Sequence, residues 1–77
     1  SGGKEEKSPR DKNRLWQHCL GATAHRGGTA SQAAMMYKRQ TGHWPGEGGE
    51  AEALHNLPAT GEWKMPVATL FPKFLKR

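Results

Sequence analysis

The sequence predicts an all-α fold, a small helical hairpin or a three- to four-helix bundle with irregular connections rich in Gly and Pro. Two helix-start signals, each followed by an amphipathic segment, support this class: Ser8-Pro9 before the first segment and Thr29 before the second. Glycines at residues 27–28 and 42 follow these segments, where a left-handed residue ends a helix at little steric cost.

The first predicted helix covers residues 9–26. Ser8 is placed to cap it, Pro9 needs no hydrogen-bond partner at the first position, and Asp11 follows in the first turn. One face is apolar: Leu15, Trp16, Cys19, Leu20 and Thr23. The opposite face is basic: Lys7, Arg10, Arg14, His18 and His25.

The second predicted helix covers residues 30–41. Thr29 and Gln32 fit a capping box at its start. Its core face carries small residues and one ring: Ala30, Ala33, Ala34 and Tyr37. Small side chains allow a close approach to the first helix. Beyond Gly42, we expect Trp44 to fold back over the helix pair, because Pro45 forbids further helix.

The remaining chain predicts short helices between loops. Residues 45–50 read as a loop, and residues 50–57 predict two helical turns, with Ala51 and Leu54 inward. Pro66 is suited to the first position of a last helix with a run of apolar residues: Val67, Leu70, Phe71, Phe74 and Leu75. Pro72 either disrupts that helix or begins a new one.

The length of 77 residues indicates one small domain, residues 9–77, or a piece of a larger protein. Residues 1–8 are interpreted as a tag scar and a disordered charged tail. No apolar run approaches the ~20 residues of a membrane span, and no signal peptide is visible. We therefore expect an intracellular protein, in the cytoplasm or in the nucleus or nucleoid, with no membrane contact.

The charge favours a polyanionic partner. Twelve Lys and Arg face seven Asp and Glu, for a net charge of +5, and such an excess promotes contact with phosphates. The predicted nucleic-acid contacts combine cations with one stacking ring: Arg10, Arg14, His18, His25, Lys38, Arg39, Trp63 and Lys64. The alternative is a solvated helix face, and residues 47–62 are acidic, so any basic surface is one-sided.

The two helices joined by Gly-Gly-Thr are similar in outline to a helix-turn-helix motif. In that motif the start of the second helix reads base edges. The corresponding residues here would be Ser31, Gln32, Met35 and Met36. An ordinary helical hairpin is the alternative.

The sequence predicts no enzyme, no metal site and no cofactor. It has one cysteine, Cys19, which falls on the apolar face of its helix, and it lacks the His and Cys spacings of zinc sites. His18 cannot pair with Cys19 as a catalytic dyad, because helical neighbours point about 100° apart.

One stretch carries a family resemblance. "RLWQHCLGATA" is followed by "HRGGTASQAAMMYKRQTGHWP", which has a Gly turn, a small-residue helix with a basic-aromatic pair and a Gly-x-Trp-Pro ending. The positions concerned are Trp16, Gly27 or Gly28, Ala33, Ala34, Tyr37, Lys38, Gly42, Trp44 and Pro45. Residues 14–45 thus resemble a small C-terminal accessory domain of bacterial and phage superfamily 2 DEAD/DEAH-type helicases, whose pattern has no counterpart for residues 46–65.

The resemblance implies a DNA-linked module, with the ATPase core elsewhere because no ATPase motif is present here. We therefore expect a non-catalytic nucleic-acid-binding accessory domain of a larger helicase, replication or repair protein, with DNA favoured over RNA. The alternative is a protein-protein docking module, whose partner or parent helicase core would contact an apolar set: Met35, Met36, Leu70, Phe71 and Phe74.

Overall fold

A computed structural model describes residues 9–75 of the chain and the side chains of all of these except Pro9, Arg10 and Glu50. Its helical segments follow in this order: α1 (Pro9–His25), α2 (Ala30–Thr41), η1 (Glu47–Ala53), η2 (Thr60–Glu62), α3 (Val67–Leu70) and η3 (Pro72–Leu75). Within residues 9–75, strand-like pairing is confined to an isolated bridge between Thr29 and Pro66. The predicted all-α class is confirmed.

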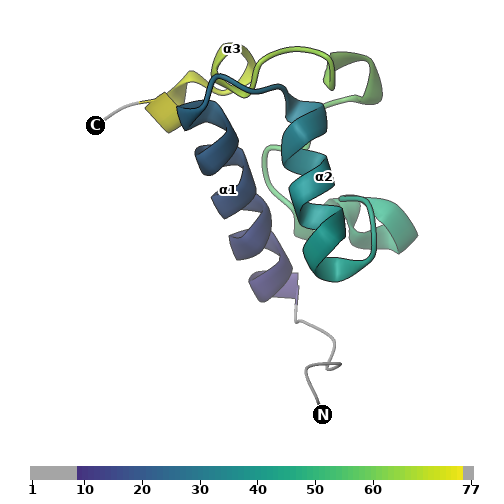
Figure 1. Cartoon of the computed structure of the whole chain (residues 1–77). Helices are drawn as coiled ribbons and strands as arrows, with labels where there is room; N and C mark the ends of the chain where they lie inside the picture. Colours follow the sequence, from purple (N-terminus) through teal and green to yellow (C-terminus); the bar gives the residue numbers. More distant parts are fainter. Residues whose placement is uncertain (1–8, 76–77) are drawn as a thin grey trace.

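The two long helices run side by side in opposite directions (Figure 1). α1 begins and α2 ends at one end of this hairpin. At the other end, α3 and η3 pack against α1 (Figure 1). The predicted cap Ser8 and the predicted tail of residues 1–8 lie outside the described residues.

The turn between α1 and α2 depends on two glycines. Gly27 has a φ of 75°, which glycine adopts without strain. The amides of Gly27 and Gly28 donate to the carbonyl oxygens of Ala24 and Thr23, at 3.0 and 2.9 Å. A β-carbon at Gly28 would collide with Gln32 Oε1 and Thr23 Cγ2. The turn is therefore closed by hydrogen bonds and too tight for a side chain.

α2 has the caps that the sequence predicts. Thr29 N donates to Gln32 Oε1 at 2.8 Å, and Gln32 N donates to Thr29 Oγ1 at 3.4 Å, which completes the capping box. At the other end Gly42 takes a left-handed conformation, with φ 83°, and its amide donates to Lys38 O at 2.7 Å. Both predicted ends of α2 are confirmed.

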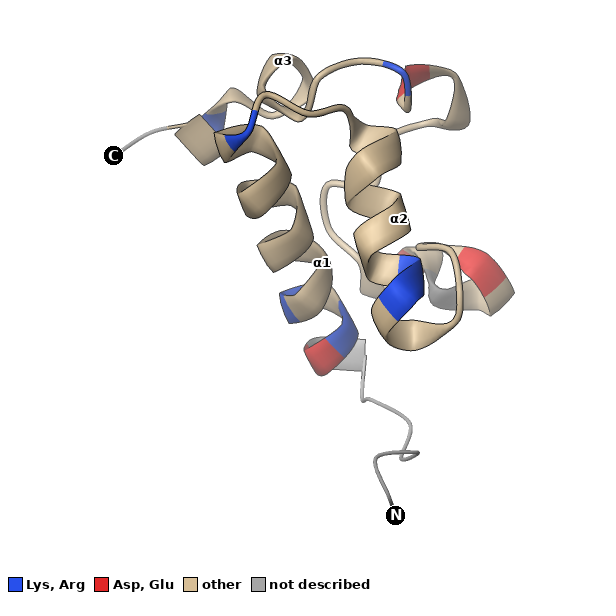
Figure 2. Ribbon diagram, viewed as in Figure 1, with Lys and Arg blue, Asp and Glu red and all other residues tan. Residues whose placement is uncertain are grey.

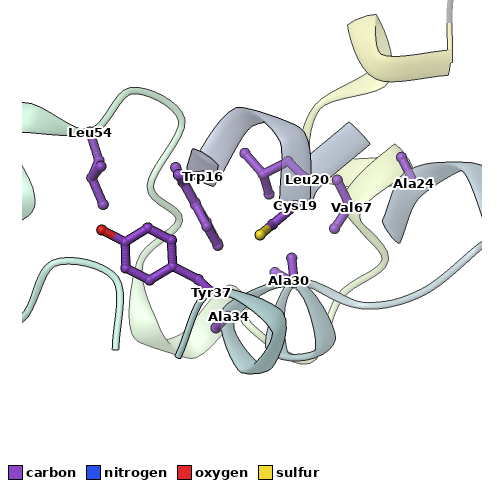
Figure 3. Close-up of a cluster of buried hydrophobic side chains, with 10 residues drawn as sticks. Trp16, Cys19, Leu20, Ala24, Ala30, Ala34, Tyr37, Leu54 and Val67 are labelled. Carbon is purple, nitrogen blue, oxygen red and sulfur yellow. The ribbon is translucent and has the colours of Figure 1, made fainter. Parts of the chain in front are cut away.

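The core lies between the two long helices and is closed at one end by Val67 (Figure 3). The predicted apolar faces are both buried: Trp16, Cys19, Leu20 and Thr23 from α1, and Ala30, Ala33, Ala34 and Tyr37 from α2. Trp16 and Tyr37 meet edge to face, with ring centroids 5.8 Å apart. The small alanine face of α2 thus accommodates the large indole of α1.

The chain after η1 is attached to α1 by polar contacts. Trp16 Nε1 donates to Asn56 O at 3.2 Å. Gln17 Nε2 donates to His55 O at 2.8 Å, and Asn56 Nδ2 donates to Gln17 Oε1 at 3.0 Å. These bonds hold Asn56 at a φ of 62°, a left-handed conformation that side chains rarely adopt. Residues 55–56 are therefore fixed by the first helix.

The prediction of a helix over residues 50–57 is wrong. The structure has instead the 3₁₀ segment η1, which begins earlier and ends at Ala53. Gly48 and Gly49, with φ values of 64° and 87°, form a kink inside η1 and divide it into two short turns. Leu54 is extended, with φ −107° and ψ 135°. It turns its side chain into the core rather than lying on a helix face.

The last predicted helix is divided in two. Pro66 precedes α3 as an extended cap residue instead of occupying its first turn, and α3 ends at Leu70. Phe71 leaves helical geometry, with φ −134° and ψ 76°, because a residue before proline is disfavoured in the helical region. Pro72 then begins η3. Of the two outcomes predicted for Pro72, a new start is confirmed.

The alanine face of α2 yields a stability prediction. Ala34 is fully buried against the core, so Ala34→Leu should lower the free energy of unfolding by about 1–3 kcal/mol through overpacking. Gln40→Leu, on the exposed side of the same helix, should change it by less than about 0.5 kcal/mol. Chemical denaturation of both variants is the measurement. Equal effects would contradict a close approach of the two helices.

Candidate nucleic-acid interface

The α1–α2 hairpin is positively charged along its length. Residues 12–46 include five Lys and Arg and no Asp or Glu. The acidic residues of the described chain lie at the start of α1 and in the short helices η1 and η2 (red in Figure 2). Beyond Asp11 in the first turn of α1, the charged residues of the hairpin are therefore all basic.

The cations of α1 line the face that points away from the core. Arg14, His18 and His25 are all exposed, whereas Trp16 and Leu20 are fully buried on the other side. Arg10 was predicted to join this set, but its side chain lies outside the described part of the chain. The exposed row on α1 thus includes one arginine and two histidines.

The cations of α2 lie in its last turn. Lys38 and Arg39 are exposed there, where positive charge interacts favourably with the helix dipole. Neither of them nor Arg14 has an acidic partner among the described side chains; the Glu47 carboxylate lies beside His43 instead, with Oε1 and Nδ1 3.5 Å apart. These three cations are therefore available to an anion from outside the chain.

Arg14 of α1 and the two cations of α2 share one end of the hairpin. The contact between Trp16 and Tyr37 places the start of α1 level with the end of α2. Arg14 lies two residues before Trp16, and Lys38 directly follows Tyr37. Figure 2 shows blue segments on both helices at this end, and further blue segments at the opposite end, near α3. Arg14 and Lys38 therefore lie at the same end of the hairpin, on neighbouring helices.

The aromatic residues near Lys38 differ in arrangement from the prediction. Trp63, expected as an exposed platform, is partly buried, and its Nε1 donates to Pro58 O at 3.1 Å. Its ring lies against Trp44, with centroids 6.1 Å apart and planes at 50°. Lys38 Nζ lies over Trp44, 4.6 Å from the ring centroid. An exposed contact of this cation–π type contributes about 0.5–1 kcal/mol.

Lys64 follows Trp63 in the chain and is exposed. It lies in the connection that crosses the start of α2, whereas Lys38 lies in the last turn of that helix. The structure thus joins Trp63 to Trp44 and Lys38 and leaves Lys64 nearer the opposite end of α2.

The start of α2 is covered by the connection before α3. The amides of Ala30 and Ser31 donate to the carbonyl oxygens of Met65 and Trp63, at 2.9 and 2.8 Å. Gln32 is engaged in the capping box. A recognition helix needs its N-terminal end free to enter a groove. The structure therefore favours the alternative of an ordinary helical hairpin over a helix-turn-helix reader.

The two methionines of α2 lie in different surroundings. Met36 Sδ accepts from Thr23 Oγ1 and Arg26 Nη2, both at 3.5 Å, so its side chain bridges back to α1. Met35 is 47% exposed. Of the residues suggested as base readers, Met35 alone combines a large apolar side chain with wide exposure.

The apolar residues predicted for protein docking cover the hairpin itself. Leu70, Phe71 and Phe74 are partly buried and pack against the core. The rings of Phe71 and Phe74 meet edge to face, with centroids 6.2 Å apart. Phe74 Cδ1 lies 3.7 Å from the position of a β-carbon on Gly21 of α1. These three residues close the fold, so Met35 is the exposed member of the predicted docking set, at 47%.

The thiol of Cys19 has low reactivity in the folded protein. Its side chain is fully buried in the core, and this burial raises the pKa of the thiol from 9.0 to about 11. The thiolate, which is the reactive form, is therefore scarce at neutral pH. Among the described residues, no three His, Cys, Asp or Glu side chains gather into a metal-binding group.

Comparison of the chain with protein-family models, curated proteins and solved structures finds no match. Between residues 9 and 75, each helix is too short or too polar to traverse a bilayer.

The raised pKa of Cys19 gives a prediction about its reactivity. At pH 8 the thiolate fraction should be about a hundredfold lower than that of an unperturbed thiol, so iodoacetamide should label native protein far more slowly than denatured protein. The folded pKa lies above the unfolded one. Ionisation of this thiol should therefore weaken folding as the pH rises from 9 to 11, and a Cys19→Ala control should lack that component. Fast labelling without denaturant would contradict the buried position.

Proposed function

We propose that this chain is a non-catalytic nucleic-acid-binding domain that contacts phosphates through the cations of its α1–α2 hairpin. The observation that carries the proposal is the absence of acidic residues between residues 12 and 46, together with the exposure of Arg14, Lys38 and Arg39 without acidic partners in the described chain. Cations of this kind bind phosphate oxygens and release condensed counterions. Surface binding needs no sculpted cavity, which suits a core as small as this one.

The family resemblance adds a context for the proposal. The residues that carry it build the hairpin: Trp16 and Tyr37 are core rings, Gly42 ends α2, and Pro45 is buried. The resemblance therefore concerns mainly the scaffold, and Lys38 is the exposed cation that it shares with the candidate interface. Together they support an accessory module of a helicase, replication or repair protein that acts on DNA, with the parent enzyme supplying catalysis.

Removal of paired charges tests the proposal. Arg14→Ala combined with Lys38→Ala should weaken binding to labelled single-stranded DNA at low salt. It should also reduce the slope of log affinity against log salt by about 1.4, because each neutralised phosphate contributes about 0.7. Fluorescence anisotropy over a salt series measures both quantities. Thermal unfolding followed by circular dichroism should shift only by the loss of the contact between Lys38 and Trp44, about 0.5–1 kcal/mol, because both substituted side chains are exposed.

A matched control removes the same charge elsewhere. Arg26 lies after α1 and Lys73 in η3, at the other end of the hairpin. Arg26→Ala combined with Lys73→Ala should leave most of the affinity intact. If the two double variants lose affinity equally, net charge alone drives binding and the proposed surface is wrong. If the unmodified chain binds no DNA at low salt, the proposed function is wrong.

A further inference from the structure

We propose that the indole ring of Trp44 is the stacking site for one unpaired base of single-stranded nucleic acid, and that Lys38 moves from this ring to the adjacent phosphate when the strand binds. This inference rests on the proposed function and specifies the class of nucleic acid. It differs from the expectation for Trp63, because the ring that Lys38 covers in the structure is that of Trp44.

The Trp44 ring is held in place before any ligand arrives. Its backbone amide donates to Glu47 Oε1 at 2.8 Å, and the following Pro45 is buried. The neighbouring ring of Trp63 is fixed by the hydrogen bond from Nε1 to Pro58 O. A ring fixed in this way loses little conformational entropy when a base stacks on it.

Lys38 is the movable group at this site. Its side chain is exposed, lies over the Trp44 ring and has no acidic partner among the described residues. Stacking of a base on an aromatic ring is generally stronger than an exposed cation–π contact. A nucleotide therefore replaces the ammonium with its base and offers that ammonium a phosphate, which is a stronger partner than the ring.

The other charged groups around the ring are compatible with a phosphate chain. Arg39 follows Lys38 on α2 and is exposed. The Glu47 carboxylate lies close to Trp44, but the Trp44 amide and the His43 ring bind it. The strand would therefore approach from the α2 side, where cations prevail, rather than from the side of η1.

Single-stranded nucleic acid fits this site better than duplex. In a duplex the faces of the bases are covered by their neighbours, so a half-buried ring on a helix flank cannot reach them. In a single strand each base has a π-face that an aromatic side chain can cover, whatever the sequence. We therefore expect binding to tolerate sequence changes and to prefer unpaired strands.

Tryptophan fluorescence of the full chain tests the proposal directly. Trp16 is fully buried and does not meet a ligand. Trp63→Phe keeps an aromatic ring beside Trp44 and leaves Trp44 as the one tryptophan with partial exposure. In this variant, saturating oligo(dT) should quench the tryptophan emission, and a fully paired DNA duplex of equal phosphate number should not.

Trp44→Leu supplies the affinity test. It removes the aromatic face of the indole and should weaken oligo(dT) binding about tenfold. Binding to the fully paired DNA duplex should change less than twofold. Trp63→Phe is the matched control and should bind oligo(dT) as the unmodified chain does. The quenching measurement needs no Trp44 variant and therefore stands even if Trp44→Leu unfolds.

The outcomes separate this inference from the proposed function. Quenching by oligo(dT) with a preference over the duplex supports both. Salt-dependent binding of single strand and duplex with equal affinity and no quenching overturns the stacking site and leaves the phosphate-binding function in place. Absence of binding to either probe at low salt overturns both.

Discussion

The buried indole of Trp16 joins the three parts of the chain on which the fold depends. Its ring edge meets Tyr37 of α2, and its Nε1 donates to Asn56 O in the segment after η1. Both rings are fully buried, and buried polar groups are costly unless they are hydrogen-bonded. This one side chain therefore sets the level of α2 against α1, and with it the shared end at which Arg14 and Lys38 lie.

Local chemistry explains why much of this fold could be predicted from the sequence. Thr29 and Gln32 form a capping box with each other, and Gly42 ends α2, so the information for these ends is contained in a few neighbouring residues. Helical periodicity likewise places Trp16, Leu20 and Tyr37 on buried faces. The prediction failed for residues 50–57. Leu54 is extended, so η1 ends at Ala53, and Asn56 takes a left-handed conformation that contacts with α1 hold in place.

Part of the candidate site could likewise be predicted from the sequence, and part of it could not. Exposure of Arg14, Lys38 and Arg39 follows from helix periodicity, so it could be predicted. The position of Trp63 could not, because its ring is fixed by a carbonyl five residues earlier and by Trp44 from a distant part of the chain. Residues 63–65 cover the start of α2 through long-range contacts, which no local sequence pattern predicts.

The claim that the hairpin surface around Lys38 and Trp44 binds nucleic acid is tested most directly by amide and indole NMR spectra during titration with oligo(dT). We expect chemical-shift changes at the backbone amides of Arg14 and Lys38 and at the indole N–H of Trp44. The NMR signal of the Trp16 indole N–H should not shift, because this group donates a hydrogen bond to Asn56 O within the fold. Shifts confined to residues 70–75, with the hairpin signals unmoved, would contradict the account.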